Sequence, residues 1–425
     1  MTESVFARSR TLTAVANTWP LLFGMFMLML GAGLQGTLLS VRATNEGFAT
    51  FVTGLVMSCY YVGYMGGSIG APRLVQRVGH IRVFAALTAV ASAVILLQGV
   101  FVEPTTWALL RGVSGFCFAG IYVVAESWLN DRASNQNRGS LLSVYMLLLY
   151  LGLGGGQFLL NVADTMSMQL FVVISVLISL AVVPMTLSVQ RAPPHELPGM
   201  TGYRELFRAS PLGVVGVAIS GVVTSAMFAM GPVYAKLAGL PRSDVATFMG
   251  LSILTAVLTQ LPIGRWSDRV DRRTVLIAIC TLGAVDAGLA TLFGTESRAW
   301  LYGLAAGFGG IALALYSLAL SHINDHLDPE QMVGASGTVV LINGAGATLG
   351  PSLVAMSMDA FSAPAYFAFL TVSVGGLALY GIYRKSRRAP VAVEQKAPFV
   401  AAQPQAAGGQ MIAEIALKSA EHREP

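Results

Sequence analysis

Charged side chains are scarce in this sequence. Only 11% of its 425 residues are Asp, Glu, Lys or Arg, against about 25% in ordinary soluble domains, and the mean hydropathy is +0.67. The 26 basic and 21 acidic residues could not coat the three or so water-soluble domains that this length would otherwise suggest. The composition therefore excludes a soluble protein and indicates one that crosses a membrane several times.

Other absences narrow the class further. The three cysteines, Cys59, Cys117 and Cys280, lie within apolar runs without paired spacing, so neither a disulfide framework nor a zinc site is expected. No Gly-Lys-Ser or Gly-Lys-Thr sequence occurs, which argues against drive by ATP. A cleavable signal peptide is not expected, because the first apolar run continues from about Trp19 to Val41. The sequence predicts no cofactor and no metal.

Twelve apolar runs are present instead, each long enough to cross a bilayer core of about 30 Å. They are predicted to be helices, because lipid cannot satisfy the backbone of an open strand, and the alternation of a membrane barrel is missing. The predicted spans are 20–41, 48–71, 83–102, 106–129, 140–162, 167–189, 212–236, 245–265, 274–294, 298–321, 332–355 and 363–383.

Basic residues near the span ends predict the orientation. With the N-terminus inside, eighteen of them fall on the inner side and four on the outer side, which places both termini in the cytoplasm. Because these residues are scattered through short loops, they do not indicate a nucleic-acid partner. We expect a monomer in the lipid bilayer of the cell inner membrane.

A proline-rich polar segment divides the spans six and six. The expected parts are a cytoplasmic N-terminus (1–19), a six-helix bundle (20–190), a cytoplasmic linker (191–211), a second six-helix bundle (212–385) and a flexible tail (386–425). Within the linker, residues 203–208 fit either a short interfacial helix or a plain polar loop.

The two halves repeat each other. Residues 122–131 and 316–325 share Tyr, Ala, Ser, Asn and Asp at a constant offset of 194, and the same offset relates two pairs of glycines in the fifth and eleventh spans. Arg77-Val78 matches Arg269-Val270 at an offset of 192. We interpret the halves as parallel repeats, an arrangement that places a substrate site between them near the bilayer midplane.

Several motifs resemble those of the Major Facilitator Superfamily, and residues 125–131 look like a little-characterised bacterial branch of it. Residues 264–273 resemble the loop signature of this family. Residues 76–82 resemble a degraded copy of it, in which Gln76 replaces the aspartate of the signature. Residues Arg111 to Gly115 resemble the family's fourth-helix pattern. A Gly-x-x-x-Gly-Pro pattern occurs at 346–351, in the eleventh span instead of the fifth. The resemblance implies gating roles for Arg77, Gly79, Asp268, Arg269, Arg272 and Arg273.

Two ions share the fourth span. Arg111 and Glu126 fall on one helical stripe with Gly115 and Tyr122 but lie about 22 Å apart along the axis, so they cannot pair. Arg111 is either a cavity cation for a carboxylate, a phosphate or a nearby acid, or a structural donor to backbone carbonyls. Glu126 is either an ion-pair partner for the loop that carries Arg77 and Arg82 or a proton carrier.

Uncharged polar residues complete the candidate set. Gln35, Tyr316 and Asn343 are expected to line the shared cavity or to bond helices together, since polar side chains do both. Asp286 is expected to be a structural acid. His322 and His326 have a metal-binding spacing, but their place beside a loop favours solvated polar residues.

These patterns predict an all-α secondary transporter. It would move a small solute by alternating access, and we expect coupling to protons. A membrane enzyme is not expected, since no catalytic pair lies at matching depth. The remaining alternative is a sensor or scaffold that keeps a transporter fold without transport. The sequence identifies neither the substrate nor the direction of transport.

Overall fold

The computed structural model describes residues 2–133, 137–187, 201–294, 296–387, 396, 399 and 401–403. All regular structure in this part of the chain is helical, which confirms the predicted all-α class. The elements are α1 (Thr2–Asn45), α2 (Thr50–Val78), α3 (His80–Val100), α4 (Pro104–Arg132), α5 (Arg138–Phe158), η1 (Leu159–Asn161), α6 (Gln169–Thr186), α7 (Tyr203–Ala209), α8 (Pro211–Leu237), α9 (Arg242–Arg269), α10 (Arg272–Phe293), α11 (Arg298–Asn324), α12 (Pro329–Ala360) and α13 (Ala365–Lys385).

Each predicted span corresponds to one long helix. Several helices continue past the predicted ends, and α2 reaches Val78 instead of residue 71. Hydropathy marks the apolar stretch alone, whereas polar residues beyond it can continue the same helix. By length and composition, 11 helices in the described chain qualify as membrane spans. α2 has the length, but its Tyr, Gly and Ser residues lower its hydropathy.

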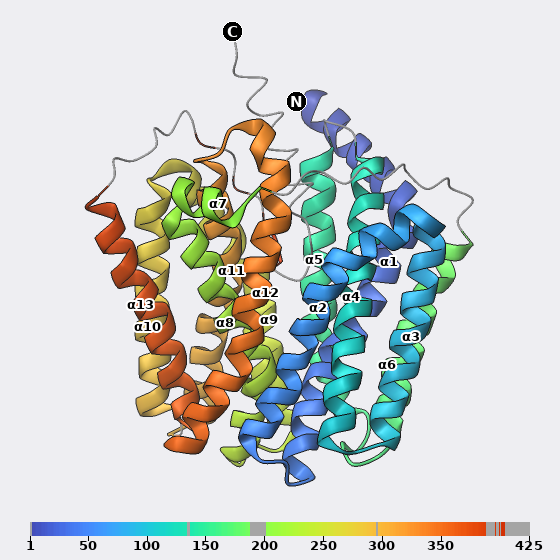
Figure 1. Cartoon of the computed structure of the whole chain (residues 1–425), viewed down its shortest axis with the longest axis vertical. Coiled ribbons are helices and arrows are strands. Elements are labelled where there is room, and N and C mark those ends of the chain that lie inside the picture. The colour runs from blue at the N-terminus through green and yellow to red at the C-terminus, as the bar shows by residue number, and fades with distance from the viewer. Residues whose placement is uncertain are drawn as a thin grey trace.

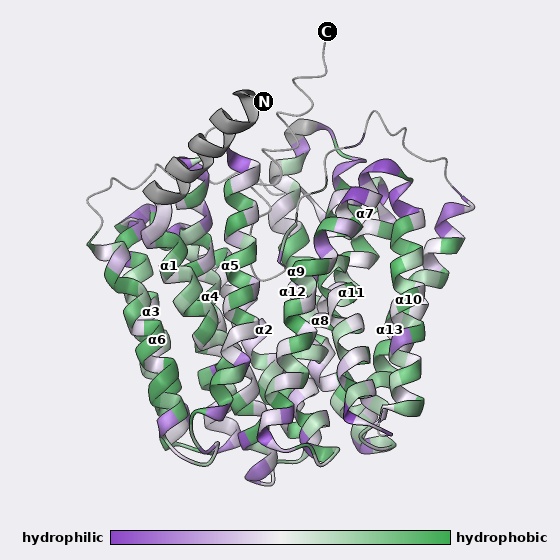
Figure 2. Cartoon of the chain, turned by 180° about the vertical axis from the view of Figure 1, so that it is seen from behind, coloured by the Kyte–Doolittle hydropathy of each residue, from purple (hydrophilic) through white to green (hydrophobic). Residues whose placement is uncertain are grey.

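The long helices form two bundles that stand side by side, α1–α6 and α8–α13 (Figure 1). α1 begins and α13 ends on the same face, which we call the terminal face, and the opposite face is called the far face. Figure 2 shows apolar residues along the flanks of both bundles and polar residues gathered at the two ends. This distribution is that of an integral multi-pass membrane protein.

The internal repeat governs helix packing as well as sequence. A Cβ on Gly115 would lie 1.8 Å from the carbonyl oxygen of Tyr60, and one on Gly309 would lie 2.0 Å from that of Ser252. Gly115 and Gly309 are 194 positions apart, while Tyr60 and Ser252 are 192 apart. The same two offsets therefore relate the α2–α4 crossing to the α9–α11 crossing. Only glycine permits such close backbone approach.

A second crossing repeats in the same way. A Cβ on Gly156 in α5 would lie 2.3 Å from the carbonyl oxygen of Leu30 in α1, and one on Gly350 in α12 would lie 2.3 Å from that of Val222 in α8. The sequence repeat thus fixes where the helices of each bundle touch, and the bundles share one architecture.

The bundles meet through their far halves. The hydroxyls of Ser58 in α2 and Ser352 in α12 lie 2.9 Å apart, and the Ser40 hydroxyl in α1 donates to the Ala229 carbonyl in α8 at 2.8 Å. About midway along the helices, the Gln260 amide in α9 donates to the Tyr150 hydroxyl in α5 at 2.6 Å. These contacts close the space between the bundles on its far side.

The linker between the bundles is described only in part, since residues 191–200 of the predicted linker lie outside the described chain. Residues 203–209 form the short helix α7, which decides between the two predicted alternatives in favour of a helix. Its Glu205 accepts a hydrogen bond from the Gln331 amide of α12 at 3.0 Å, so α7 is anchored to the second bundle.

Candidate functional site

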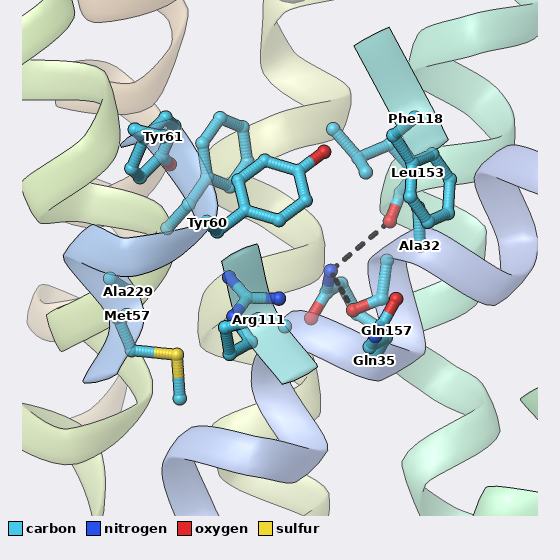
Figure 3. A pocket seen from close by; sticks show the side chains of 13 residues that line it. Ala32, Gln35, Met57, Tyr60, Tyr61, Arg111, Phe118, Leu153, Gln157 and Ala229 are labelled. Atoms are coloured by element: carbon cyan, nitrogen blue, oxygen red, sulfur yellow. Dashed lines mark hydrogen bonds between the residues drawn. The ribbon is translucent and has the colours of Figure 1, made fainter. Parts of the chain in front are cut away.

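A cavity lies between the bundles in their far half (Figure 3). Its empty volume of about 580 Å³, which includes the space at its mouth, falls in the range of about 300–1,000 Å³ usual for small-molecule sites. Side chains from α1, α2, α4, α5 and α8 surround it, so both bundles contribute. The lining residues are Ala32, Gly33, Gln35, Gly36, Met57, Tyr60, Tyr61, Arg111, Phe118, Leu153, Gln157, Phe228 and Ala229.

Arg111 carries a buried positive charge in this cavity. The side chain is 7% exposed, and its guanidinium carbon lies 4.5 Å from the centre of the Tyr60 ring. The close crossing at Gly115 brings α2 against α4 and so sets the Tyr60 ring beside the guanidinium. In the described chain, the Nε of Arg111 has no hydrogen-bond partner, and no carboxylate forms an ion pair with this residue.

Glutamine side chains form the opposite wall of the cavity (Figure 3). The Gln157 amide donates to the carbonyl oxygens of Gly33 at 2.9 Å and Leu153 at 3.1 Å. The Gln35 amide donates to the Gln98 side chain at 3.4 Å. This wall offers fixed polar groups without charge, so Arg111 dominates the electrostatics of the cavity.

A second polar cluster surrounds Glu126, nearer the terminal face. Glu126 is 6% exposed, and its Oε1 atom has no hydrogen-bond partner in the described chain. The ion pair expected with Arg77 or Arg82 is not formed among the described residues, and Arg77 is exposed. Four buried tyrosines lie within electrostatic range of the carboxyl group instead: Tyr64, Tyr122, Tyr145 and Tyr316.

A row of tyrosines connects the two clusters. The ring centres of Tyr60 and Tyr64 lie 6.2 Å apart, and those of Tyr64 and Tyr122 lie 6.5 Å apart. Tyr60 contacts Arg111, whereas Tyr64 and Tyr122 approach Glu126. The buried cation and the buried acid are therefore joined by a continuous polar and aromatic path, although they are too far apart to pair.

The uncharged candidates divide between the two possible roles. Gln35 lines the cavity, and Tyr316 belongs to the Glu126 cluster although it comes from the second bundle. The Tyr122 hydroxyl donates to the Met29 sulfur at 3.0 Å. Asn343 donates to the Val217 carbonyl at 3.1 Å and to Ser220 at 3.0 Å, which binds α12 to α8.

The predicted gating loop of the second bundle has a buried arginine at its centre. Arg272 contacts Asp325 at 3.0 Å, Asp268 at 3.2 Å and the Ser321 carbonyl at 2.7 Å. Arg273 pairs with Asp271 at 2.8 Å, while Arg269 is exposed. In this conformation the loop ties α9, α10 and α11 together. Its counterpart turns at Gly79, whose φ of +88° favours glycine.

Two other expectations concern residues outside these clusters. His322 lies in the last turn of α11 and is buried, so the predicted solvated loop is wrong for this residue; the helix continues three residues past the predicted span. Asp286 packs beside Gly307 of α11, and its Oδ1 has no hydrogen-bond partner in the described chain.

Sequence reasoning missed most of the aromatic residues at both clusters. Tyr60, Tyr61 and Tyr64 occur within one turn and a half of a glycine-rich span, a pattern that could have been noticed as a polar stripe. Tyr145 and Gln157 gave no such signal, because single polar residues in apolar spans are common. Tertiary packing alone brings them to the clusters.

Comparisons with known proteins agree with this architecture. A family model of the Major Facilitator Superfamily matches residues 21–306 and 239–418. The chain is 30% identical over 374 residues to the uncharacterized MFS-type transporter YcaD of Escherichia fergusonii, covering 86% of this chain and 95% of that protein. Its identity to YcaD of Escherichia coli is 28% over 376 residues, covering 87% and 96%.

Solved structures show the same fold at low sequence identity. A mutant of the nucleoside transporter NupG matches with a TM-score of 0.75 at 13% identity, covering 87% of this chain and 100% of that one. A bacterial homologue of the human lysosomal transporter Spinster, in an inward-facing and unoccupied conformation, matches with a TM-score of 0.68 at 15% identity, covering 95% and 98%. At these identities the likeness concerns the fold alone.

Proposed function

The chain belongs to the Major Facilitator Superfamily and is a membrane transporter of a small molecule, and from this premise we propose that it carries a small organic anion by proton-coupled alternating access. The observation that carries the proposal is Arg111, a buried guanidinium in the central cavity without an acidic partner in the described chain.

The charge of Arg111 favours an anion. A buried charge that has no partner costs several kcal/mol of desolvation, on the order of the penalty usual for isolated ions in proteins. A carboxylate that enters the cavity would offset this cost and could accept two parallel hydrogen bonds from the guanidinium. The Tyr60, Tyr61 and Phe118 rings would contact the apolar body of the substrate. A cation would be repelled by the same site.

Glu126 is the residue that we propose to carry the proton. A buried carboxyl with an unpartnered oxygen must either bind a proton or gain a partner when its surroundings change. Tyr316 reaches it from the second bundle, so relative movement of the bundles would alter those surroundings. This coupling between bundle position and protonation is what proton-driven alternating access requires.

The proposed cycle opens the cavity first to one face and then to the other. The bundles meet through their far halves, so opening toward the far face requires that the Ser58–Ser352 and Ser40–Ala229 contacts separate. In the proposed orientation, the terminal face is cytoplasmic and the protein lies in the inner membrane, as the excess of basic residues on that face favours.

Three probes of one shape and different charge test the proposal. Purified protein would be titrated with benzoate, benzamide and benzamidinium, and binding would be measured by calorimetry. We expect binding in that order, with benzamidinium the weakest. Equal binding of benzamide and benzoate would contradict the anion proposal without affecting the transporter assignment.

Transport is tested separately, by counterflow of radiolabelled benzenesulfonate in proteoliposomes with and without a pH gradient. Benzenesulfonate is chosen because its permanent charge prevents passive crossing. Binding of benzoate without any counterflow would favour the alternative of a sensor or scaffold. Accumulation that survives a protonophore but requires sodium would overturn proton coupling.

A further inference from the structure

Part of the C-terminal tail packs against the inner wall of the second bundle. The backbone N–H of Phe399 donates to the Asp268 carboxylate at 2.9 Å, and the Lys396 ammonium group donates to the Ser267 carbonyl at 3.5 Å and to the Val270 carbonyl. Gly264 of α9 provides the notch for the Phe399 ring, since a Cβ there would lie 2.3 Å from a ring carbon. The contacts combine a shaped apolar notch with specific polar partners.

The segment continues onto α11. The Ser317 hydroxyl accepts a hydrogen bond from the Ala402 N–H at 2.9 Å and donates one to the Ala402 carbonyl at 3.0 Å. One side chain thus satisfies both backbone groups of a residue that is 1% exposed. A backbone buried in this way costs little only because its hydrogen bonds are complete.

The segment then reaches the first bundle. Gln403 is 3% exposed, and its side chain lies close to the Tyr150 hydroxyl of α5. The same hydroxyl accepts a hydrogen bond from Gln260 of α9 at 2.6 Å. The last described residue of the tail, Gln403, therefore lies where α5 of the first bundle meets α9 of the second. Ser317 adjoins Tyr316, so this point lies beside the Glu126 cluster.

We propose that the described tail residues Lys396, Phe399 and 401–403 form an autoinhibitory segment that binds between the bundles and blocks the route from the terminal face to the central cavity. Closure of the terminal face would bring α5 toward α9 and α11, and the segment occupies the space between Tyr150 and Ser317. A bound segment therefore excludes substrate and also holds the terminal face apart. Transport requires that the segment leave.

The chemistry of the wall fits this occupant. Asp268 accepts a backbone N–H, the carbonyls of Ser267 and Val270 accept the Lys396 ammonium group, and Gly264 admits an aromatic ring. Asp268 also pairs with Arg272, so the segment engages the proposed gating loop itself. Release of the segment would free Asp268 for a new partner across the gate.

A disulfide cross-link tests the docking. Cys59, Cys117 and Cys280 would be replaced by serine, and Ser317→Cys with Ala402→Cys would be introduced into the full-length protein. We expect oxidation to cross-link the pair in native membranes. Ser58→Cys with Ser352→Cys serves as the positive control, because those hydroxyls lie 2.9 Å apart. A control pair that cross-links while the tail pair does not would overturn the proposal.

The accessibility of residue 317 to a thiol reagent tests whether the tail segment blocks the route from the terminal face. No substrate is needed, so the outcome is independent of the proposed function. The single cysteine in Ser317→Cys would be labelled with a membrane-impermeant maleimide from the terminal face. We expect faster labelling after Phe399→Ala and after truncation behind Arg387. Phe361→Ala is the matched control, because Phe361 is 83% exposed on the far face. Equal labelling rates in all four proteins would refute the block.

The rate of benzenesulfonate counterflow gives the functional consequence. If the segment is bound in nine molecules of ten, its removal should raise counterflow about tenfold. The protein with Ser317→Cys and Ala402→Cys should be inactive when its disulfide is formed, and reduction of the disulfide should restore activity. If the cross-linked protein transports as fast as the same protein after its disulfide is reduced, the segment binds without blocking transport. That result would also overturn the proposal.

Discussion

The two bundles share one backbone plan but differ sharply in buried polar residues. At the repeat offset of 194, Arg111 corresponds to Ala305 and Glu126 to Leu320, both buried apolar residues of the second bundle. Tyr145 likewise corresponds to Val339. The glycine crossings are retained in both halves, whereas the second half has uncharged residues at the positions of Arg111 and Glu126. The repeat therefore preserves the packing, and the first bundle carries the proposed binding and coupling chemistry.

The terminal face shows the opposite difference. Arg272 in the second bundle bonds the Ser321 carbonyl and Asp325, and its counterpart at the offset of 192 is His80, which hydrogen-bonds Ser127 at 3.0 Å. The ion pairs of the gating loop are thus concentrated in the second bundle. We infer a division in which the first bundle holds the substrate and the second controls entry from the terminal face.

The largest effect is expected from Arg111→Ala, which makes the first bundle resemble the second at this position. Loss of charge-assisted hydrogen bonds should weaken benzoate binding and counterflow about a hundredfold. Membrane insertion should not suffer, since a central charge costs about 2.5–3.5 kcal/mol. Calorimetry and counterflow measure the loss.

Two variants sharpen this result. Arg298→Ala is the control, because Arg298 is exposed and pairs with Asp244 on the far face at 2.9 Å. Arg111→Lys should retain partial activity if charge suffices and lose nearly all if the planar guanidinium is needed. Arg111→Ala protein that cannot be purified intact would favour the structural role, and full activity would exclude both roles.

Glu126→Gln is expected to separate proton drive from substrate movement. The amide keeps the size of the side chain but cannot carry a proton, so accumulation driven by a pH gradient should disappear while counterflow persists. Fluxes measured with and without the gradient decide this. Glu103→Gln, at the exposed start of α4, should behave as the unaltered protein. Gradient-driven accumulation that survives Glu126→Gln would rule out this carrier.

Alanine at the repeated glycines compares the packing of the halves directly. Gly115→Ala and Gly309→Ala should each destabilise the fold by about 1–3 kcal/mol, because the new methyl group overlaps a backbone carbonyl. Only Gly115→Ala should also weaken benzoate binding, since it displaces Tyr60 from Arg111. Thermal unfolding and calorimetry distinguish the effects. Equal losses of affinity in both variants would contradict the proposed division.

Asp268→Asn tests the gate. Asp268 stands where the first bundle has Gln76 at the repeat offset, so the change leaves an uncharged amide at this position in both loops. In the closed gate we expect this carboxylate near the N-terminus of α5 at Gly139, where the helix dipole favours an anion. Loss of the charge should shift the resting population toward an open terminal face. Distances between spin labels on that face should increase; unchanged distances would reject the role.

The smallest effect is expected from Asp271→Ala. The Asp271 side chain caps α10 by accepting the Arg273 N–H at 3.0 Å, whereas Gly79 starts α3 without a side-chain cap. Loss of the cap should cost about 1 kcal/mol. The measurement is thermal unfolding, and Gly79→Ala is not a usable control because of its positive φ.

The contribution of Asp271 should depend on pH. Partial burial opposes ionisation, but the hydrogen bonds and charge of Arg273 outweigh it and hold the pKa of Asp271 below its usual value. A lowered folded-state pKa means that the stabilisation is complete above the unfolded-state pKa of 3.8 and is lost as pH falls through the folded-state value. The stability difference between Asp271→Ala and the unaltered protein should therefore vanish only in strong acid.

Sequence reasoning named two of the polar residues that line the cavity. Arg111 and Gln35 were each an open choice between a cavity residue and a structural contact, and both line the cavity. Sequence reasoning was less reliable where several helices contribute. Asn343 was an open choice between cavity and helix contact and binds α12 to α8, while Tyr60 and Gln157 were missed. His322 was misplaced because hydropathy does not show where a helix ends.

The sequence by itself determined the membrane class, the two-bundle repeat and the pair of buried ions, since each follows from local composition or from a fixed offset along the chain. Only the tertiary structure decided that Arg111 has no acidic partner in the described chain, that four tyrosines lie within electrostatic range of Glu126 and that part of the tail packs on α9 and α11. These facts depend on which faces of separate helices meet. Helices separated by long stretches of chain meet through packing, and no local pattern encodes that choice.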